Sequence, residues 1–138
     1  MIANPEEFVM LRRSKHQVDY LRSATDCATS EVWLEVIRKF PDMRIWVAHN
    51  KTIPIEILSL LARDPNPEVR AAVAMKNKLS YGLMELLAKD VDDSVRERVT
   101  YNEKTPSQIL EQLAGDPCDR VRTQSRACLA SESPKKRE

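Results

Sequence analysis

Apolar residues recur along this chain with a period of 26 residues. The arginines at positions 44, 70, 96 and 122 mark that period, each 26 residues from the next. The apolar positions in the same register are Met43, Val69, Val95 and Val121; Val47, Val73 and Val99; Leu58, Met84 and Leu110; and Leu61, Leu87 and Leu113. Because these columns share one register without a gap, the pattern indicates tandem repeats.

The apolar spacing within each repeat predicts two short helices. In the first helix, Val69 and Val73 are four residues apart and therefore share one helical face. In the second helix, Leu58 and Leu61 are three residues apart, and Ile57 lies beside them. The chain holds only 2 glycines and shows no alternation typical of strands. We therefore expect an all-α chain.

Three polar residues predict where some of these helices begin. Asp64 and Asp116 each precede a proline, which is the pattern of an N-cap followed by proline at the first helical position. Thr105 is followed three residues later by Gln108, which is the pattern of a capping box. We therefore expect Asp64 and Asp116 to cap first helices, and Thr105 to cap a second helix.

The repeats are expected to stack into an α-solenoid, because a pair of helices about ten residues long cannot bury its apolar face alone. About four to five repeats fill residues 29–130, if one residue is deleted near Lys39 and Phe40. Residues 1–28 are a divergent N-terminal cap, so that residues 1–130 form a single domain. Residues 131–138 carry no apolar side chain and are expected to form a disordered basic tail.

The repeated string L-A-x-D-P-x-x-x-V-R-x-x-V-A-x-N-x-x-T-P-x-x-x-L resembles the leucine-rich repeat variant family and, more broadly, the HEAT-like repeat proteins of bacteria. The resemblance covers about residues 30–126. It implies a right-handed superhelix of short helices and a role in binding partners, but no reaction. Some members carry an iron–sulfur cluster in a cysteine-rich N-terminal segment, where this chain has only Cys27. The related HEAT-like lyases and alkylated-base glycosylases offer no motif that matches this chain residue by residue.

Composition and charge argue against some classes of partner. The chain has 22 Lys and Arg residues against 21 Asp and Glu residues, and its 42% hydrophobic content is that of a globular protein. This balance argues against a nucleic acid or an anionic membrane as the partner. The sequence also lacks a signal-peptide pattern and any apolar run of about 18 residues. We expect a soluble, cytoplasmic protein.

The cysteines and histidines do not indicate a metal, a cofactor or catalysis. Cys27, Cys118 and Cys128 are an odd number without CxxC spacing, which fits a reducing compartment. His16 and His49 have no Cys, Asp or His partner at ligand spacing. We therefore expect no metal site, no cofactor and no enzymatic activity.

Two polar columns accompany the apolar ones. The arginine column is Arg44, Arg70, Arg96 and Arg122, and the aspartate column is Asp64, Asp90 and Asp116. In three repeats the aspartate lies six residues before the arginine. The structural interpretation is a ladder in which guanidinium groups meet carboxylates and carbonyls and link the loops of adjacent repeats. The alternative is a row of arginines that binds phosphate groups.

Two further columns vary in chemistry and predict an exposed stripe. One column reads Trp46, Ala72, Arg98 and Gln124, and the other reads His49, Met75, Tyr101 and Ala127. A column that accepts Arg and Gln is expected to face solvent, and positions three apart share one face of a helix. The candidate partner-binding stripe is therefore Trp46, His49, Met75, Arg98 and Tyr101, whose residue types are common in binding hot spots. The alternative is that residues 1–28 fold over Trp46 as a cap.

These features together predict a protein-binding module without catalysis, with an unidentified protein as its partner. The alternatives are a nucleic-acid-binding repeat protein, which the charge balance disfavours, and an enzyme of the lyase or glycosylase kind.

Overall fold

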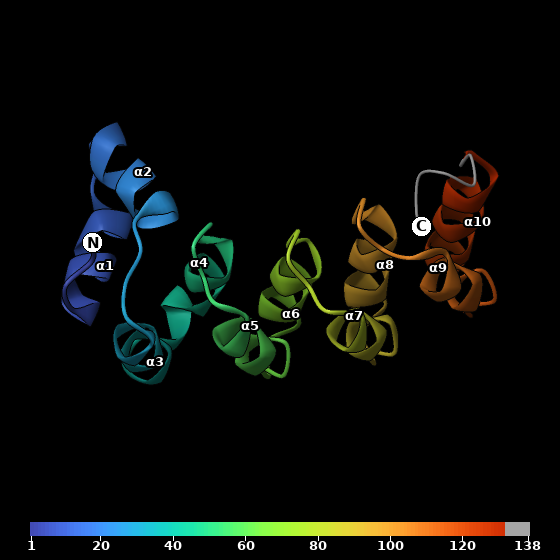
Figure 1. The fold of residues 1–138 in the computed structure, drawn as a ribbon, viewed down its shortest axis with the longest axis horizontal. Helices are drawn as coiled ribbons and strands as arrows, with labels where there is room; N and C mark the ends of the chain where they lie inside the picture. Colours follow the sequence, from blue (N-terminus) through green and yellow to red (C-terminus); the bar gives the residue numbers. More distant parts are fainter. Residues whose placement is uncertain (132–138) are drawn as a thin grey trace. The chain divides into compact units, whose positions relative to one another are not determined.

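The computed structural model describes residues 1–131, which fold into helices that pack on one another and contain no strand. The chain divides into two compact units, residues 1–63 and residues 64 onward. The helices of both units are labelled in Figure 1. Ser131, the first residue of the predicted tail, is the last residue of a helix, and residues 132–138 lie outside the described residues.

The first unit contains five α-helices and one short 3-10 helix. They are α1 (Pro5–Arg13), α2 (Gln17–Thr25), α3 (Ser30–Lys39), η1 (Pro41–Met43), α4 (Arg44–His49) and α5 (Ile55–Leu61). Helix α1 packs on α2 and α3, and α4 contacts α2, α3 and α5. The irregular step that the sequence places near Lys39 and Phe40 coincides with the end of α3 and the start of η1.

The core of the first unit forms around Trp33. Its indole ring is fully buried and meets the ring of Phe8 edge to face, with centroids 5.2 Å apart. Leu11 on α1, Val36 on α3 and Val47 on α4 are also buried here. Trp33 is therefore a central residue of this core. Its Nε1–H has no hydrogen-bond partner among residues 1–131, so the packing must outweigh one unsatisfied donor.

The second unit repeats one helix-pair arrangement. It contains α6 (Pro67–Ala74), α7 (Tyr81–Ala88), α8 (Asp93–Tyr101), α9 (Ser107–Leu113) and α10 (Asp119–Ser131). Helix α8 packs between α6 and α10, while α7 packs on α9 (Figure 1). The apolar columns line this core: Val69, Val73, Val95, Val99, Val121, Met84, Leu87, Leu110 and Leu113 are all buried. The predicted core faces of both helix types are confirmed.

The predicted N-caps were wrong by two residues. Helix α6 is capped by Asn66, whose side chain accepts a hydrogen bond from the Glu68 N–H at 2.9 Å, and Pro67 occupies the first turn. Asp64 lies before the cap, where its carboxylate accepts the Asn66 N–H at 2.9 Å. Asp116 accepts the Cys118 N–H in the same way. These aspartates therefore shape the turn that leads into the helix rather than the helix end itself.

The predicted capping box at Thr105 was also wrong. Helix α9 has Pro106 at its N-cap position, without a capping hydrogen bond from a side chain. The Thr105 hydroxyl instead donates to the carbonyl oxygen of Val99 at 2.6 Å and is fully buried. Thr105 therefore ties the link between α8 and α9 to the end of α8.

Candidate functional site

The arginines of the second unit connect consecutive helix pairs. Arg70 donates from Nε and Nη2 to the two carboxylate oxygens of Asp90, at 2.7 and 3.0 Å. Its Nη1 donates to the Asp64 carbonyl oxygen at 2.7 Å. Arg96 contacts the Asp116 carboxylate at 2.8 and 3.2 Å and the Asp90 carbonyl at 2.7 Å. Each arginine thus joins the turn before its own helix to the same turn one repeat later.

These ion pairs are mostly shielded from solvent. The side chains of Arg96 and Asp116 are only 15% and 6% exposed, and Arg70 and Asp90 are similarly buried. Burial alone would raise the pKa of Asp116, but hydrogen bonds from Arg96 and from the Cys118 N–H outweigh burial and lower it. The hydrogen bond to Asp116 in turn raises the pKa of Arg96. Both groups are therefore held in their charged forms.

The outer members of the arginine column make other contacts. Arg44 donates from Nε to the carbonyl oxygen of Ile37 at 2.8 Å within the first unit. Arg122 donates from Nη1 to the Asp116 carbonyl at 2.9 Å, and its Nη2 meets the Asp119 carboxylate. All four arginines of the column therefore hold the carbonyl oxygen of a residue that precedes their own helix.

Two buried asparagines connect helix ends, and the sequence analysis missed their role. Asn102 donates from Nδ2 to the carbonyl oxygens of Ala74 and Lys76, both at 2.8 Å, across 28 and 26 residues of chain. Asn50 makes the corresponding bonds to Ser23 and Asp26, at 2.9 and 3.0 Å. A signal was present, because Asn50 and Asn102 follow corresponding helices and both precede a threonine in a polar link. A buried asparagine that meets helix-end carbonyls stabilises the packing of adjacent helix pairs.

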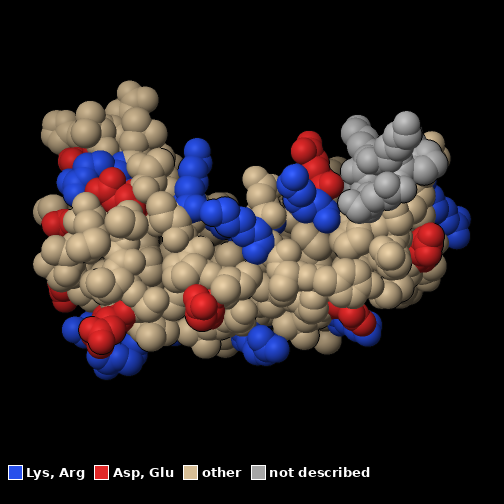
Figure 2. Space-filling model, viewed as in Figure 1, with Lys and Arg blue, Asp and Glu red and all other residues tan. Residues whose placement is uncertain are grey.

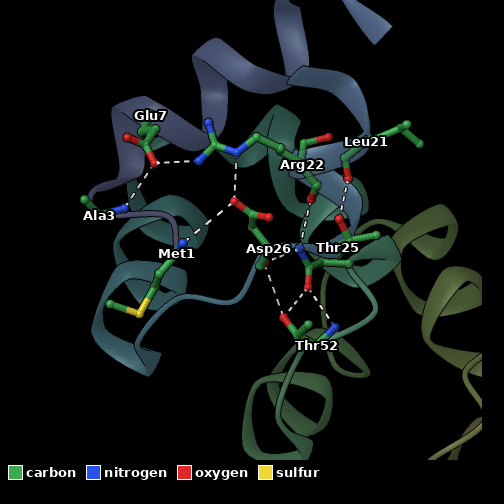
Figure 3. Close-up of polar contacts among 10 residues, drawn as sticks. Met1, Ala3, Glu7, Leu21, Arg22, Thr25, Asp26 and Thr52 are labelled. Carbon is green, nitrogen blue, oxygen red and sulfur yellow. Dashed lines mark hydrogen bonds and ion pairs between the residues drawn. The ribbon is translucent and has the colours of Figure 1, made fainter. Parts of the chain in front are cut away.

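A network of polar contacts around Asp26 fastens the N-terminal helices of the first unit (Figure 3). Arg22 donates from Nε to the Asp26 carboxylate at 2.9 Å, and its Nη2 lies 3.7 Å from Glu7 on α1. The amino group of Met1 lies 3.8 Å from the same Asp26 carboxylate. Thr52 donates to the Asp26 carbonyl at 3.4 Å. The network therefore ties α1, α2 and the link after α4 together.

The N-terminal half of the predicted stripe lies beneath an arginine of α1. The guanidinium carbon of Arg12 lies 3.5 Å from the ring centroid of Trp46 and 4.0 Å from that of Tyr20. The His49 ring is 5.6 Å from Trp46, and its side chain is exposed. Cation–π contacts of this geometry are favourable. Trp46 is half-buried. Arg12, which contacts it, belongs to residues 1–28, the segment that the alternative interpretation places over Trp46 as a cap.

The C-terminal half of the predicted stripe is open to solvent. Met75 is the C-cap residue of α6 and is 40% exposed, and Tyr101 is the last residue of α8 and is 52% exposed. Arg98 lies one helical turn before Tyr101 and is also exposed. Because α6 packs on α8 and the two residues occupy equivalent positions, Met75 and Tyr101 belong to the same face of the second unit. Their neighbours Val73 and Val99 fill the core.

The described residues offer little support for a metal site or a membrane span. No group of three or more His, Cys, Asp and Glu side chains in residues 1–131 is placed to hold a metal ion. Within the same part of the chain, every helix is too short or too polar to cross a membrane. Cys27, Cys118 and Cys128 are free thiols.

Comparison with protein-family models, with curated proteins and with solved structures found no match to this chain.

Proposed function

We propose that this chain is a non-catalytic protein-binding module, built as a right-handed α-solenoid of two-helix repeats of the leucine-rich repeat variant or HEAT-like kind. Its proposed partner is a protein, which it binds through the part of the stripe that lies in the second unit, Met75, Arg98 and Tyr101. Three free cysteines are compatible with a reducing compartment, and we propose that the module acts in the cytoplasm.

The repeated contacts of the second unit support the solenoid. Helices at corresponding positions pack on each other, α6 on α8 and α8 on α10, and corresponding arginines bind corresponding aspartates across 20 residues of chain. Such contacts between neighbouring repeats are the source of stability in repeat proteins. They also hold the first helices at a fixed spacing, which a recognition surface requires.

The exposure of Met75 and Tyr101 carries the functional proposal. Both occur at equivalent, outward positions of helices whose other apolar residues are buried. Tyrosine, arginine and methionine are enriched in protein interfaces, and Arg98 lies beside Tyr101 on the same helix face. A rigid pair of helices with these side chains at its surface suits recognition of another protein.

The contacts of the arginine column weaken the nucleic-acid alternative. Arg70 and Arg96 already bind carboxylates with two hydrogen bonds each, and their side chains are 13% and 15% exposed. A phosphate group would have to displace Asp90 or Asp116 to reach them. Nucleic-acid affinity normally comes from accessible Lys and Arg side chains, so the column is better suited to holding the repeats together.

A capture experiment tests the proposed function. The wild-type chain, immobilised on beads, is expected to retain a protein from a lysate of the source cells. The variant Met75→Ala/Tyr101→Ala should lose it, since truncating a hot-spot residue costs about 2 kcal/mol or more of binding free energy. Tyr81→Ala is the matched control, because Tyr81 is 46% exposed on α7 and lies outside the stripe. Retention of the same protein by the double variant would refute the proposed surface.

A further inference from the structure

Arg98 of the stripe and two lysines near it form no ion pair with the acidic residues that the structure describes in the second unit. Lys78, Arg98 and Lys104 are all exposed, and none of them forms an ion pair among residues 64–131. Lys78 follows Met75 by three residues and Lys104 follows Tyr101 by three residues, so they occupy equivalent positions in the links after α6 and α8. Unpaired charges therefore accompany the exposed apolar side chains.

Several other cations of the second unit form ion pairs. Arg70 pairs with Asp90, Arg96 with Asp116, and Lys89 with Glu85 at 3.1 Å. Arg120 lies 3.3 Å from Asp93 and 3.6 Å from Glu97. Lys78, Arg98 and Lys104 differ from these paired cations, and all three lie near the edge at which α6 and α8 end, which we call the link edge.

The link edge is positively charged overall. In Figure 2, Lys and Arg side chains lie over the ends of α6 and α8 from which the links leave, with acidic side chains beside them at α8. Glu103 is an exposed carboxylate in the link after α8, and it is flanked in sequence by Lys104. Three exposed cations against this one carboxylate leave an excess of positive charge around Met75 and Tyr101.

We propose that the link edge binds an acidic protein segment, whose carboxylates face Lys78, Arg98 and Lys104 while one of its apolar side chains packs on Met75 and Tyr101. This inference rests on the proposed function and specifies the chemistry of the partner. Complementary charge around a small apolar contact gives specificity and speeds association. A protein segment fits better than a nucleic acid, because three cations interrupted by a carboxylate are too few to follow a phosphate backbone.

A peptide selection tests this inference without knowledge of the natural partner. A library of random 12-residue peptides displayed on phage is selected on the immobilised wild-type chain. Selected peptides are expected to be enriched in Asp and Glu and to carry a large apolar residue. Their binding should weaken about tenfold in Lys78→Gln/Lys104→Gln, because each lost rim charge contributes modestly to affinity. Raising the salt concentration should weaken binding to the wild type.

The matched control is Lys89→Gln/Arg120→Gln, which removes the same amount of charge from two cations that are 66% and 61% exposed but already paired. It should bind the selected peptides as the wild type does. Equal weakening in both double variants would show that only net charge matters and would overturn the proposal. Neutral or basic selected peptides would overturn it as well, as would tighter binding of a labelled single-stranded oligonucleotide than of any selected peptide.

The selection also separates failure of this inference from failure of the proposed function. If the selected peptides need Met75 and Tyr101 but bind Lys78→Gln/Lys104→Gln as tightly as the wild type, the proposed binding surface stands and the proposal of an acidic partner is refuted. A selection that yields no peptide dependent on Met75 and Tyr101 would refute both proposals.

Discussion

Replacing Arg96 with alanine should destabilise the second unit much more than replacing Arg98, although the two arginines lie two residues apart on α8. Arg96→Ala removes two hydrogen bonds to the Asp116 carboxylate and one to the Asp90 carbonyl. Arg98 is exposed and forms no ion pair in the described part of the chain, which makes Arg98→Ala the matched control.

The size of the destabilisation depends on how exposed the ion pair is and on which hydrogen bonds Asp116 retains without Arg96. Breaking a fully buried ion pair costs about 3–5 kcal/mol. The Arg96 side chain is 15% exposed, and Asp116 still accepts the Cys118 N–H at 2.9 Å after the substitution. We therefore expect Arg96→Ala to lower the free energy of unfolding by about 2–3 kcal/mol, and Arg98→Ala by less than about 0.5 kcal/mol.

The cost of Arg96→Ala should also depend on pH. The pKa of Asp116 is lowered in the folded protein, so its ionised form stabilises the fold above its ordinary pKa, and that contribution disappears as the pH falls through the folded value. Without Arg96, burial of the Asp116 carboxylate is no longer compensated. The difference between wild type and variant should thus be largest at neutral pH and shrink in acid.

Urea unfolding followed by circular dichroism measures these differences. The single variants Arg96→Ala and Asp116→Asn are compared with the double variant Arg96→Ala/Asp116→Asn, which isolates the interaction energy of the ion pair. We expect the two single changes to be strongly non-additive, since each removes the same contact. Equal costs at Arg96 and Arg98, or a cost at Arg96 that grows in acid, would refute this account of the ion pair.

Two further predictions concern residues that the sequence analysis did not single out. Asn102→Ala should lower the free energy of unfolding by about 2 kcal/mol, because two carbonyl oxygens lose their donor. Asn77 is exposed, so the control Asn77→Ala should cost less than about 0.5 kcal/mol, and equal costs in urea unfolding would contradict the role of Asn102. Arg12→Ala should increase quenching of Trp46 fluorescence by acrylamide, measured with Trp33 replaced by Phe; unchanged quenching would mean that Arg12 does not shield the indole ring.

The core of the second unit could be predicted from the sequence because the repeats use the same positions three or four times. A column such as Val69, Val95 and Val121 has no other simple explanation than a shared buried face, and all three residues are buried. Periodicity therefore identified which residues pack inward, although it could not identify where each helix begins.

The helix starts were misplaced because one local pattern serves two structures. An aspartate before proline fits an N-cap, but it fits equally a turn in which the carboxylate accepts the N–H two residues later, as Asp64 does. The sequence also does not state which carboxylate an arginine reaches. Asp90 lies six residues before Arg96 but offers it only a backbone carbonyl oxygen. The guanidinium group of Arg96 pairs instead with the carboxylate of Asp116, 20 residues later.

Contacts of the N-terminal helices were beyond sequence reasoning for a different reason. Residues 1–28 do not share the repeat register, so no column predicts what α1 or α2 covers. The position of Arg12 between Tyr20 and Trp46 depends on how α1 packs on α2 and α3. This position of Arg12 therefore could not be predicted without the packing of the whole first unit.

Photocrosslinking at position 101 tests most directly the claim that the ends of α6 and α8 are a protein-binding surface. Tyr101 is replaced by the photoreactive aromatic p-benzoylphenylalanine, and Tyr81 is replaced in the same way as a control of similar exposure. After illumination in cell extract, we expect a protein crosslinked at position 101 and not at position 81, and loss of that product when Met75 is also changed to Ala. Crosslinks of equal yield at both positions, or at position 81 alone, would contradict the account.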